Sequence, residues 1–514
     1  MSSAANPPAS AAADQGLDRS TWIVAGVVLL GAVMSILDTT VINVAIDRLA
    51  VDFKTSLTTI QWVVTGYTLA LAAVIPMSGW AADRFGTKRI YIWSLLLFML
   101  GSILSGLAWS AESLIGFRVL QGIGGGMIMP AVMTIMTKKA GPARMGRVMG
   151  VLGVPMLVAP IAGPILGGWL VDSVSWRWIF FINVPIGIVA VALAIRVLER
   201  DESQAGHRLD WLGMALLSPG LTALIFGLAE SSSDGFGAVK SWLPIVVGAA
   251  GIVAFFWHSW RTESPLIDIR TFTHTRAGAA AITFMLFAIA FFGAMLLMPL
   301  YFQTVRGASA LEAGLLLVPQ GLGAMITMPL AGKLTDRYGP SRWPVVGIPL
   351  LVIGIAPFAF VTAHTPYALL LSFSFVLGLG MGFSMMPTMT AAMQAVPPTA
   401  IARTSTAMNI IRQAGASIGT AILSVLLSSA IVDKLASGGA APSGGGGIDK
   451  IHSLTPAQHA AVAEPLSEAF AQTFVWAVVL LALAFVPALW MALRARHDPA
   501  PAHVGHAQPA PALE

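Results

Sequence analysis

Two short segments, 253 residues apart, decide how this chain is organised. Residues 79–89 read GWAADRFGTKR, and residues 332–342 read GKLTDRYGPSR. Both follow the pattern G-x-x-x-D-R-[FY]-G, and each one closes the second long apolar segment of its part of the chain. A pattern that recurs at a long, fixed offset is typical of an internal repeat. We therefore interpret the chain as two related halves.

The sequence around these two segments is strongly apolar. Hydrophobic residues make up 56% of the 514 residues and charged residues only 10%, whereas about a quarter of the residues of a soluble domain are charged. A chain with so few charges cannot cover its surface with them, so lipid must contact much of the exterior. The composition excludes most soluble folds and predicts an integral membrane protein.

The apolar residues form fourteen long runs. A helix that crosses about 30 Å of hydrocarbon needs about 20 apolar residues, which is the length of these runs. They fall at 21–46, 56–82, 90–110, 114–137, 148–171, 176–195, 211–229, 241–260, 277–303, 311–332, 343–363, 366–395, 404–432 and 470–493. A transmembrane β-barrel would instead show short alternating segments. We expect an all-α integral membrane protein with fourteen transmembrane helices.

The repeat offset divides these helices. Eight runs begin within one offset, two more than a six-helix half requires, and the surplus pair is 211–229 and 241–260. The predicted order is a tail at 1–20, a six-helix bundle at 21–200, two linking helices at 201–265, a second six-helix bundle at 266–493 with a long outer loop at 433–469, and a tail at 494–514.

The positions of Lys and Arg predict the orientation in the membrane. With both termini in the cytoplasm, 20 of the 29 basic residues fall in cytoplasmic segments and 7 on the opposite side. Short cytoplasmic loops carry such an excess, so we expect a multi-pass protein of the bacterial cytoplasmic (inner) membrane. The basic residues stand singly between apolar runs, which argues against nucleic acid as a partner despite the net charge of +5.

Metal and thiol chemistry have no support in the sequence. The chain has no Cys, which excludes disulfides, thiolate metal sites and Cys nucleophiles. The nine His show no metal-binding spacing, and two of them, His503 and His506, lie in an Ala/Pro-rich tail. We expect no metal and no cofactor.

Asp38 is the one carboxylate well inside a predicted span. An ionised acid at membrane depth is costly, so such residues mark ion or substrate paths by default. We expect protons and substrate to compete for Asp38, which makes it a proton-coupling residue. The alternative is a structural Asp that an Arg or a backbone group neutralises.

Three further segments carry a family resemblance. They are ILDTTVINVA at 36–45, LIGFRVLQGIGGG at 114–126 and GPILGGWL at 163–170. Together with the two repeated segments, they make residues 21–432 resemble the major facilitator superfamily, and within it the fourteen-helix drug:proton antiporters of the EmrB/QacA type. The resemblance implies a major facilitator fold, with two six-helix bundles around a central cavity and two extra helices.

The resemblance also implies roles for residues in these segments. Arg118 matches the Arg of a proton-relay signature, so we expect it to act beside Asp38; the alternative is a structural Arg that bonds backbone carbonyls. Small residues one turn apart, with a Pro between them, let helices approach closely and bend. The residues of this antiporter helix motif are Gly163, Pro164, Gly167 and Gly168.

We interpret the repeated segments as gating loops. Their acids can bind a neighbouring helix N-terminus and their cations can pair with acids across the bundle, which would lock one gate. The alternative is a plain solvated turn. The predicted gating residues are Gly79, Asp83, Arg84, Gly86, Gly332, Asp336, Arg337 and Gly339.

A substrate cavity needs aromatic and adaptable side chains near the middle of the membrane. Arg412, an intramembrane cation, is predicted either to serve as a gate residue there or to snorkel. The alternative for the others is contact with lipid or neighbouring helices. The candidate cavity residues are Asn43, Trp62, Tyr67, Met298, Tyr301, Phe302, Asn409, Arg412 and Gln413.

The function that the sequence predicts is proton-driven efflux of amphipathic, cationic or neutral, drug-like compounds by alternating access, with antibiotic resistance as a consequence. Its partners are these small molecules, protons and the lipid bilayer. A membrane-fusion adaptor is compatible with the resemblance, although no segment specifies one. A same-fold transporter of a lipid, siderophore or metabolite is the first alternative. A polytopic membrane enzyme is disfavoured, because Asp38, Arg118 and Arg412 are too few polar residues for a catalytic site and no nucleophile elbow, metal motif or phosphate loop is present.

Overall fold

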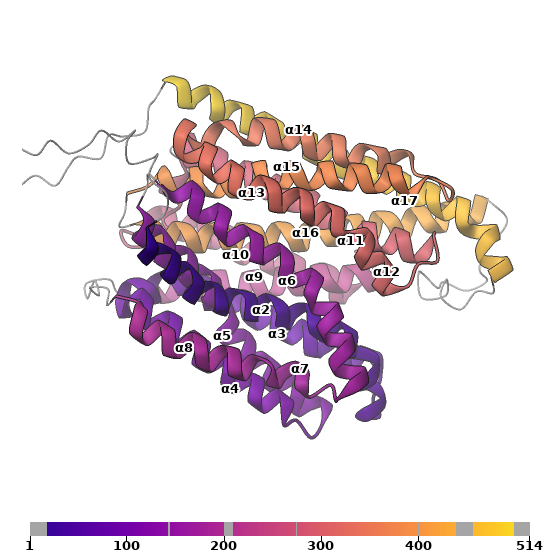
Figure 1. The fold of residues 1–514 in the computed structure, drawn as a ribbon, viewed down its shortest axis with the longest axis horizontal. Helices are drawn as coiled ribbons and strands as arrows, with labels where there is room; N and C mark the ends of the chain where they lie inside the picture. The colour runs from indigo at the N-terminus through magenta and orange to yellow at the C-terminus, as the bar shows by residue number, and fades with distance from the viewer. Residues whose placement is uncertain are drawn as a thin grey trace, which may run out of the picture.

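The computed structural model describes residues 18–141, 144–199, 209–273, 275–397, 400–437 and 456–497. Within these ranges every regular element is a helix (Figure 1). A helix satisfies its backbone hydrogen bonds internally, as a chain in lipid must. The prediction of an all-α fold is confirmed for this part of the chain. The predicted tails lie outside it except for 18–20 and 494–497, as does 438–455 of the predicted outer loop.

The helices follow one another in a simple order. The first group is α2 (Arg19–Asp52), α3 (Leu57–Phe85), α4 (Thr87–Gly106), α5 (Ala111–Ala140), α6 (Met145–Ser173), α7 (Trp178–Phe181) and α8 (Asn183–Val197). The middle pair is α9 (Trp211–Asp234) and α10 (Val239–Arg261). The last group is η2 (Ile269–Thr273), α11 (Thr275–Thr304), α12 (Ala310–Leu316), α13 (Val318–Tyr338), η3 (Pro340–Arg342), α14 (Pro344–Ile355), η4 (Ala356–Phe360), α15 (Tyr367–Gln394), α16 (Ile401–Ser437) and α17 (Pro456–His497).

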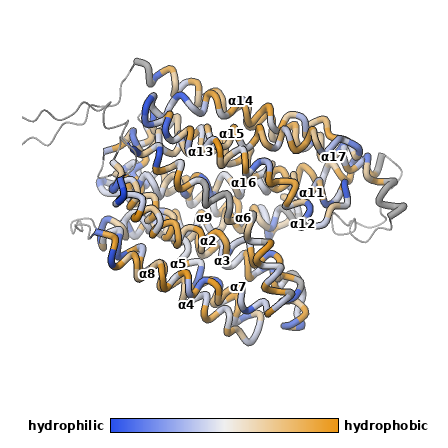
Figure 2. Tube along the Cα trace, in the orientation of Figure 1, coloured by the Kyte–Doolittle hydropathy of each residue, from blue (hydrophilic) through white to orange (hydrophobic). Residues whose placement is uncertain are grey.

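Thirteen helical stretches of the described residues are long and apolar enough to cross a membrane, and each coincides with a predicted span. The remaining predicted span, 148–171, lies within α6, a helix of 29 residues. Figure 2 shows hydrophobic residues along the lengths of the helices and hydrophilic residues gathered near their ends. This distribution is the one expected for a bundle that crosses a bilayer.

The helices pack as two bundles, and a helical hairpin separates these bundles in the sequence. In the first bundle, α5 lies against α3 and α4, and α2 lies against α6 and α8. In the second bundle, α15 lies against α13 and α14, and α11 lies against α16 and α17. Figure 1 shows the indigo-to-magenta bundle beside the orange-to-yellow one.

The middle pair joins these bundles. Helices α9 and α10 pack on each other, and α9 also contacts α3 of the first bundle and α16 of the second. Small residues permit the close approach within the pair, because Gly248 of α10 lies directly against the backbone of Leu224 in α9. The extra hairpin therefore bridges both halves on one side of the molecule.

The repeat is visible in the local backbone. Helix α3 ends at Gly86 with φ 88°, and α13 ends at Gly339 with φ 84°. Each Gly donates its backbone N–H to a carbonyl four residues earlier, Ala82 at 3.0 Å and Thr335 at 2.9 Å. Only Gly adopts such a positive φ without steric cost. The last Gly of both repeated segments is thus required by the same sharp helix end.

Glu312, another acid at the edge of a predicted span, has a local structural role. Ser309 and Glu312 form a capping box at the start of α12, in which each side chain accepts from the other residue's backbone N–H. Such a box satisfies N–H groups that a helix start leaves unpaired.

Candidate functional site

Asp38 of α2 forms a buried ion pair with Arg118 of α5. Arg118 Nη1 donates to Asp38 Oδ2 at 2.5 Å, and neither side chain is exposed. Removing two charges from water is costly, and the pair persists only if further hydrogen bonds satisfy its remaining polar atoms. The structure therefore brings together the two residues that the sequence predicted to act jointly.

Neutral polar side chains complete the surroundings of Asp38. Gln121 Nε2 and Asn183 Nδ2 both donate to Asp38 Oδ1, at 2.9 and 3.0 Å. The same two amides donate to Ser102 Oγ, which in turn donates to the backbone carbonyl of Phe180. We call Asp38, Arg118, Gln121, Asn183 and Ser102 the carboxylate cluster. The last three were not predicted from the sequence, although Gln121 lies three residues after Arg118 and so shares its helix face.

Arg118 is held from several sides. Its guanidinium also donates to Gln121 Oε1 at 2.7 Å and to the carbonyl of Val63 at 3.3 Å. It lies 4.2 Å from the centre of the Tyr67 ring, within the range of a cation–π contact. Its Nη2 has no hydrogen-bond partner among the described residues. One buried donor of Arg118 is therefore free in this conformation.

Small residues bring the helices of the cluster together. A Cβ on Gly163 of α6 would collide with the Thr40 side chain, and one on Gly167 would lie 2.9 Å from the carbonyl oxygen of Val41. The motif on α6 thus packs on α2 one turn beyond Asp38. Gly168 is less tightly packed, and the side chain of Pro164 is outside the described part of the structure.

The first gating segment contacts the second bundle. A Cβ on Gly79 of α3 would lie 2.9 Å from Thr406 Oγ1 of α16. Asp83 Oδ2 is 3.4 Å from Arg403 Nε of α16, and the hydroxyl groups of Ser78 and Thr406 are 3.0 Å apart. Arg84 is half-buried on the same turn of α3. This segment joins α3 to α16 at one end of the molecule.

The second gating segment makes the reciprocal contact. A Cβ on Gly332 of α13 would lie 2.5 Å from the carbonyl oxygen of Gly146 in α6. Asp336 accepts from the backbone N–H groups of Gly146 and Arg147 at 2.7 and 3.2 Å, and Arg147 Nε is 3.6 Å away. Arg337 lies over the Tyr338 ring instead.

The two gating segments therefore lie at one end of the molecule, which we call the motif end. Each uses its first Gly and its Asp to bind the opposite bundle, and the bundles are in direct contact there. An acid at the N-terminus of α6 also complements the helix dipole. In this conformation the motif end is closed.

A small cavity lies between the two bundles. The space in it that is open to the centre of a water molecule is about 20 Å³, which is enough for about one water molecule. Two methionines of α5, three of α15 and one of α16 line it, together with Phe284, Asn409 and Arg412. We call this site the methionine chamber. The methionines are Met129, Met133, Met385, Met386, Met389 and Met408.

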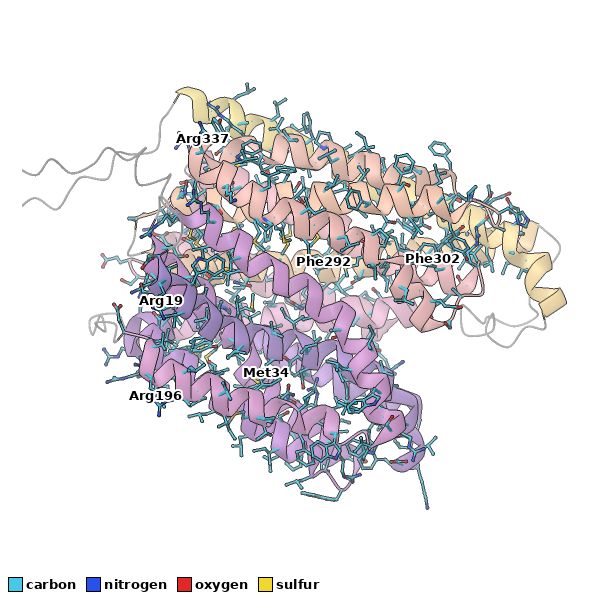
Figure 3. All side chains as sticks on the ribbon, viewed as in Figure 1. Arg19, Met34, Arg196, Phe292, Phe302 and Arg337 are labelled. Carbon is cyan, nitrogen blue, oxygen red and sulfur yellow. The ribbon has the colours of Figure 1, made fainter. Side chains whose placement is uncertain are left out.

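The other predicted cavity residues lie elsewhere. Trp62 lines an open groove between α3 and α9, with its ring 5.8 Å from that of Phe226. Tyr67 is buried against Arg118, Asn43 is exposed, and Gln413 is partly exposed. Three more are buried in the hydrophobic core of the second bundle, near the end opposite to Arg337 in Figure 3, where Phe302 is labelled. They are Met298, Tyr301 and Phe302.

The described residues contain no group of three or more His, Cys, Asp or Glu that is arranged to hold a metal ion. Two interior sites that contain charged side chains are the carboxylate cluster and the methionine chamber.

Comparisons with known proteins agree with this architecture. The family model "Major Facilitator Superfamily" matches residues 28–420. The multidrug resistance protein B homolog of Mycobacterium tuberculosis is 43% identical over 494 residues, covering 93% of this chain and 90% of the relative. The multidrug export protein EmrB of Escherichia coli is 30% identical over 402 residues, covering 77% of this chain and 78% of the relative.

A solved structure supports the fold alone. The human organic anion transporter MFSD10 superposes with a TM-score of 0.59 at 13% sequence identity, covering 93% of this chain and all of that one. The family match, the bacterial relatives and the two related bundles agree. The chain belongs to the major facilitator superfamily, and is a multi-pass membrane transporter rather than an enzyme.

Proposed function

We propose that this protein exports amphipathic drug-like compounds across a bacterial cytoplasmic membrane by proton-coupled alternating access. The names of the M. tuberculosis and E. coli relatives support multidrug export. The observation that carries proton coupling is the Asp38 carboxylate, which is buried inside a helix bundle and receives hydrogen bonds from Arg118, Gln121 and Asn183.

Proton binding at Asp38 would disturb the whole carboxylate cluster. The three donors suit an ionised carboxylate, because both of its oxygens accept. A proton on Asp38 removes the negative charge that Arg118 requires, and leaving a buried guanidinium unpaired is strongly unfavourable. Arg118 then has to find another acceptor, which favours a different arrangement of α2 and α5. Proton uptake is thereby linked to helix movement.

The closed motif end supports one direction for the proposed cycle. We place this end in the cytoplasm because basic residues concentrate there, and Figure 3 shows Arg19, Arg196 and Arg337 together at one end of the molecule. The conformation described here is then closed to the cytoplasm. Protons reach Asp38 from outside, and their release inside accompanies the opening that admits substrate.

Transport in proteoliposomes tests this function. We would measure movement of cationic, neutral and anionic amphipathic dyes under an imposed pH gradient, comparing the wild type with Asp38→Asn. We expect gradient-driven transport in the wild type and a loss of at least tenfold in Asp38→Asn, since the neutral amide cannot exchange a proton.

Glu112→Gln is the matched control, because Glu112 is an exposed acid at the start of α5. It should retain the wild-type rate. Full gradient-driven transport by Asp38→Asn would remove Asp38 from the coupling mechanism, and gradient-independent transport of every dye would refute antiport.

A further inference from the structure

Arg412 lies deep in the membrane-spanning region. It stands nine residues after Arg403 on α16, which is about 13 Å at a rise of about 1.5 Å per residue. That distance is close to half of a hydrocarbon core of about 30 Å. Arg403 itself lies at the closed motif end, where it contacts Asp83. The methionine chamber therefore holds a cation near the middle of the membrane.

This cation lacks a resident counter-ion. Arg412 makes no hydrogen bond or ion pair with any described residue, and no carboxylate lines the chamber. Arg118 and Arg403, on the other hand, each contact an Asp. An unpaired charge at membrane depth is costly, and such residues face cavities or substrate paths by default.

We propose that the transported compound supplies the missing anion. On the proposed export function, the substrates are amphipathic monoanions with a carboxylate or phenolate group. The anionic group binds the Arg412 guanidinium, whose planar donors match a carboxylate, and the apolar body lies among the methionines. Asn409, on the same face of α16 three residues earlier, is a second polar group beside the bound anion.

The methionines explain how a small chamber takes a larger ligand. Met129 and Met133 belong to the first bundle, whereas the other four belong to the second. The site therefore widens when the bundles separate at the motif end, and closes again around or behind the ligand. Flexible thioether side chains fill irregular space and tolerate ligands of different shapes.

The charge of the chamber changes the expected substrate. The sequence alone favoured cationic or neutral compounds because Asp38 was the acid available to them. In the structure Asp38 is bound by Arg118, Gln121 and Asn183 within the first bundle, so its charge is already compensated. Arg412 is the one charged side chain among the residues that line the methionine chamber, so a cationic ligand there would be repelled.

Binding of a matched pair of probes tests the proposal. We would titrate purified full-length protein, in nanodiscs of zwitterionic lipid, with dansyl-undecanoic acid and with its uncharged carboxamide, following the dansyl fluorescence. We expect the wild type to bind the acid at least tenfold more tightly, as a hydrogen bond between charged groups allows. Arg412→Gln should abolish this preference and leave carboxamide affinity within about twofold, which also shows that the variant is folded. Arg412→Lys should keep part of the preference.

Arg48→Gln is the control, because Arg48 is an exposed arginine at the other end of the first bundle and its loss removes the same charge. It should keep the full preference. Equal binding of the two probes by the wild type, or an unchanged preference in Arg412→Gln, would overturn the proposal. Loss of acid binding in nanodiscs that contain anionic lipid would assign Arg412 to a lipid headgroup and also overturn it. Gradient-driven export of neutral dyes is measured in a separate experiment. A negative binding result would therefore refute anion binding at Arg412 without refuting proton-coupled export.

Discussion

At the scale of single residues, Arg118 is the side chain on which the carboxylate cluster depends. It contacts Asp38, Gln121 Oε1, the Val63 carbonyl and the Tyr67 ring at once. A planar guanidinium with five donors can make these contacts together, whereas a lysine ammonium is a compact charge that does not stack in the same way. Charge alone therefore does not account for the residue type at this position.

This gives a prediction for Arg118→Lys. The variant keeps the charge but loses the fork and the ring contact, so we expect gradient-driven transport to fall at least tenfold, which corresponds to about 1.4 kcal/mol. Initial rates in proteoliposomes measure the effect. Arg48→Lys, the same change at an exposed position, should transport normally. An unchanged rate in Arg118→Lys would show that Arg118 only neutralises Asp38.

Sequence reasoning found the charged members of this cluster but not the neutral ones. Asp38 and Arg118 are conspicuous because a charge inside an apolar span is costly and rare. Gln121, Asn183 and Ser102 carry no such signal, since amides and hydroxyls in membrane helices also bond along their own helix. Their role follows only from the contact of α2, α4, α5 and α8, which joins residues up to 145 positions apart. The missing counter-ion of Arg412 likewise became visible only in three dimensions.

At the scale of elements, helix positions were predictable and helix breaks were not. Each of the thirteen membrane-crossing stretches coincides with a predicted run, because length and hydropathy are local properties. The run predicted at 311–332 is instead divided into α12 and α13 at Leu317, just before Pro319. Likewise α14 is flanked by the 3₁₀ turns η3 and η4. Such breaks depend on packing against neighbouring helices.

The contact between α13 and α6 gives an element-scale prediction. In Gly332→Ala the new Cβ lies 2.5 Å from the Gly146 carbonyl oxygen, and backbone cannot yield as a side chain can. Overpacking of this kind destabilises a packed site by about 1–3 kcal/mol. Here it destabilises the conformation in which the motif end is closed. We expect transport to slow several-fold while the protein still folds.

The matched control is Gly26→Ala on α2, where a Cβ meets nothing within 4 Å. Thermal unfolding of the two purified variants separates a loss of stability from a change in transport. If Gly332→Ala transported like Gly26→Ala, close packing of α13 on α6 would not matter for the cycle.

At the scale of the whole molecule, the duplicated segment predicted two related halves, and the family match confirms the major facilitator fold. Which end is closed could not be predicted, because one sequence must specify both the inward-open and outward-open states. The placement of α9 against both α3 and α16 was also inaccessible, since it depends on contacts between segments far apart in sequence. The two halves can thus be recognised from the sequence, whereas the contacts between them are known only from the structure.

Alternating access requires the contact between α3 and α16 to break in every cycle. The hydroxyl groups of Ser78 and Thr406 are 3.0 Å apart across that contact, within the range where two introduced sulfurs form a bond of about 2.0 Å after small adjustments. Because the chain has no Cys, the double variant Ser78→Cys/Thr406→Cys has a single possible pairing. We expect oxidation to abolish transport and reductant to restore it, as read by dye flux and cross-linking yield. Each single variant should resist oxidation, whereas undiminished flux in fully cross-linked protein would mean that the motif end never opens.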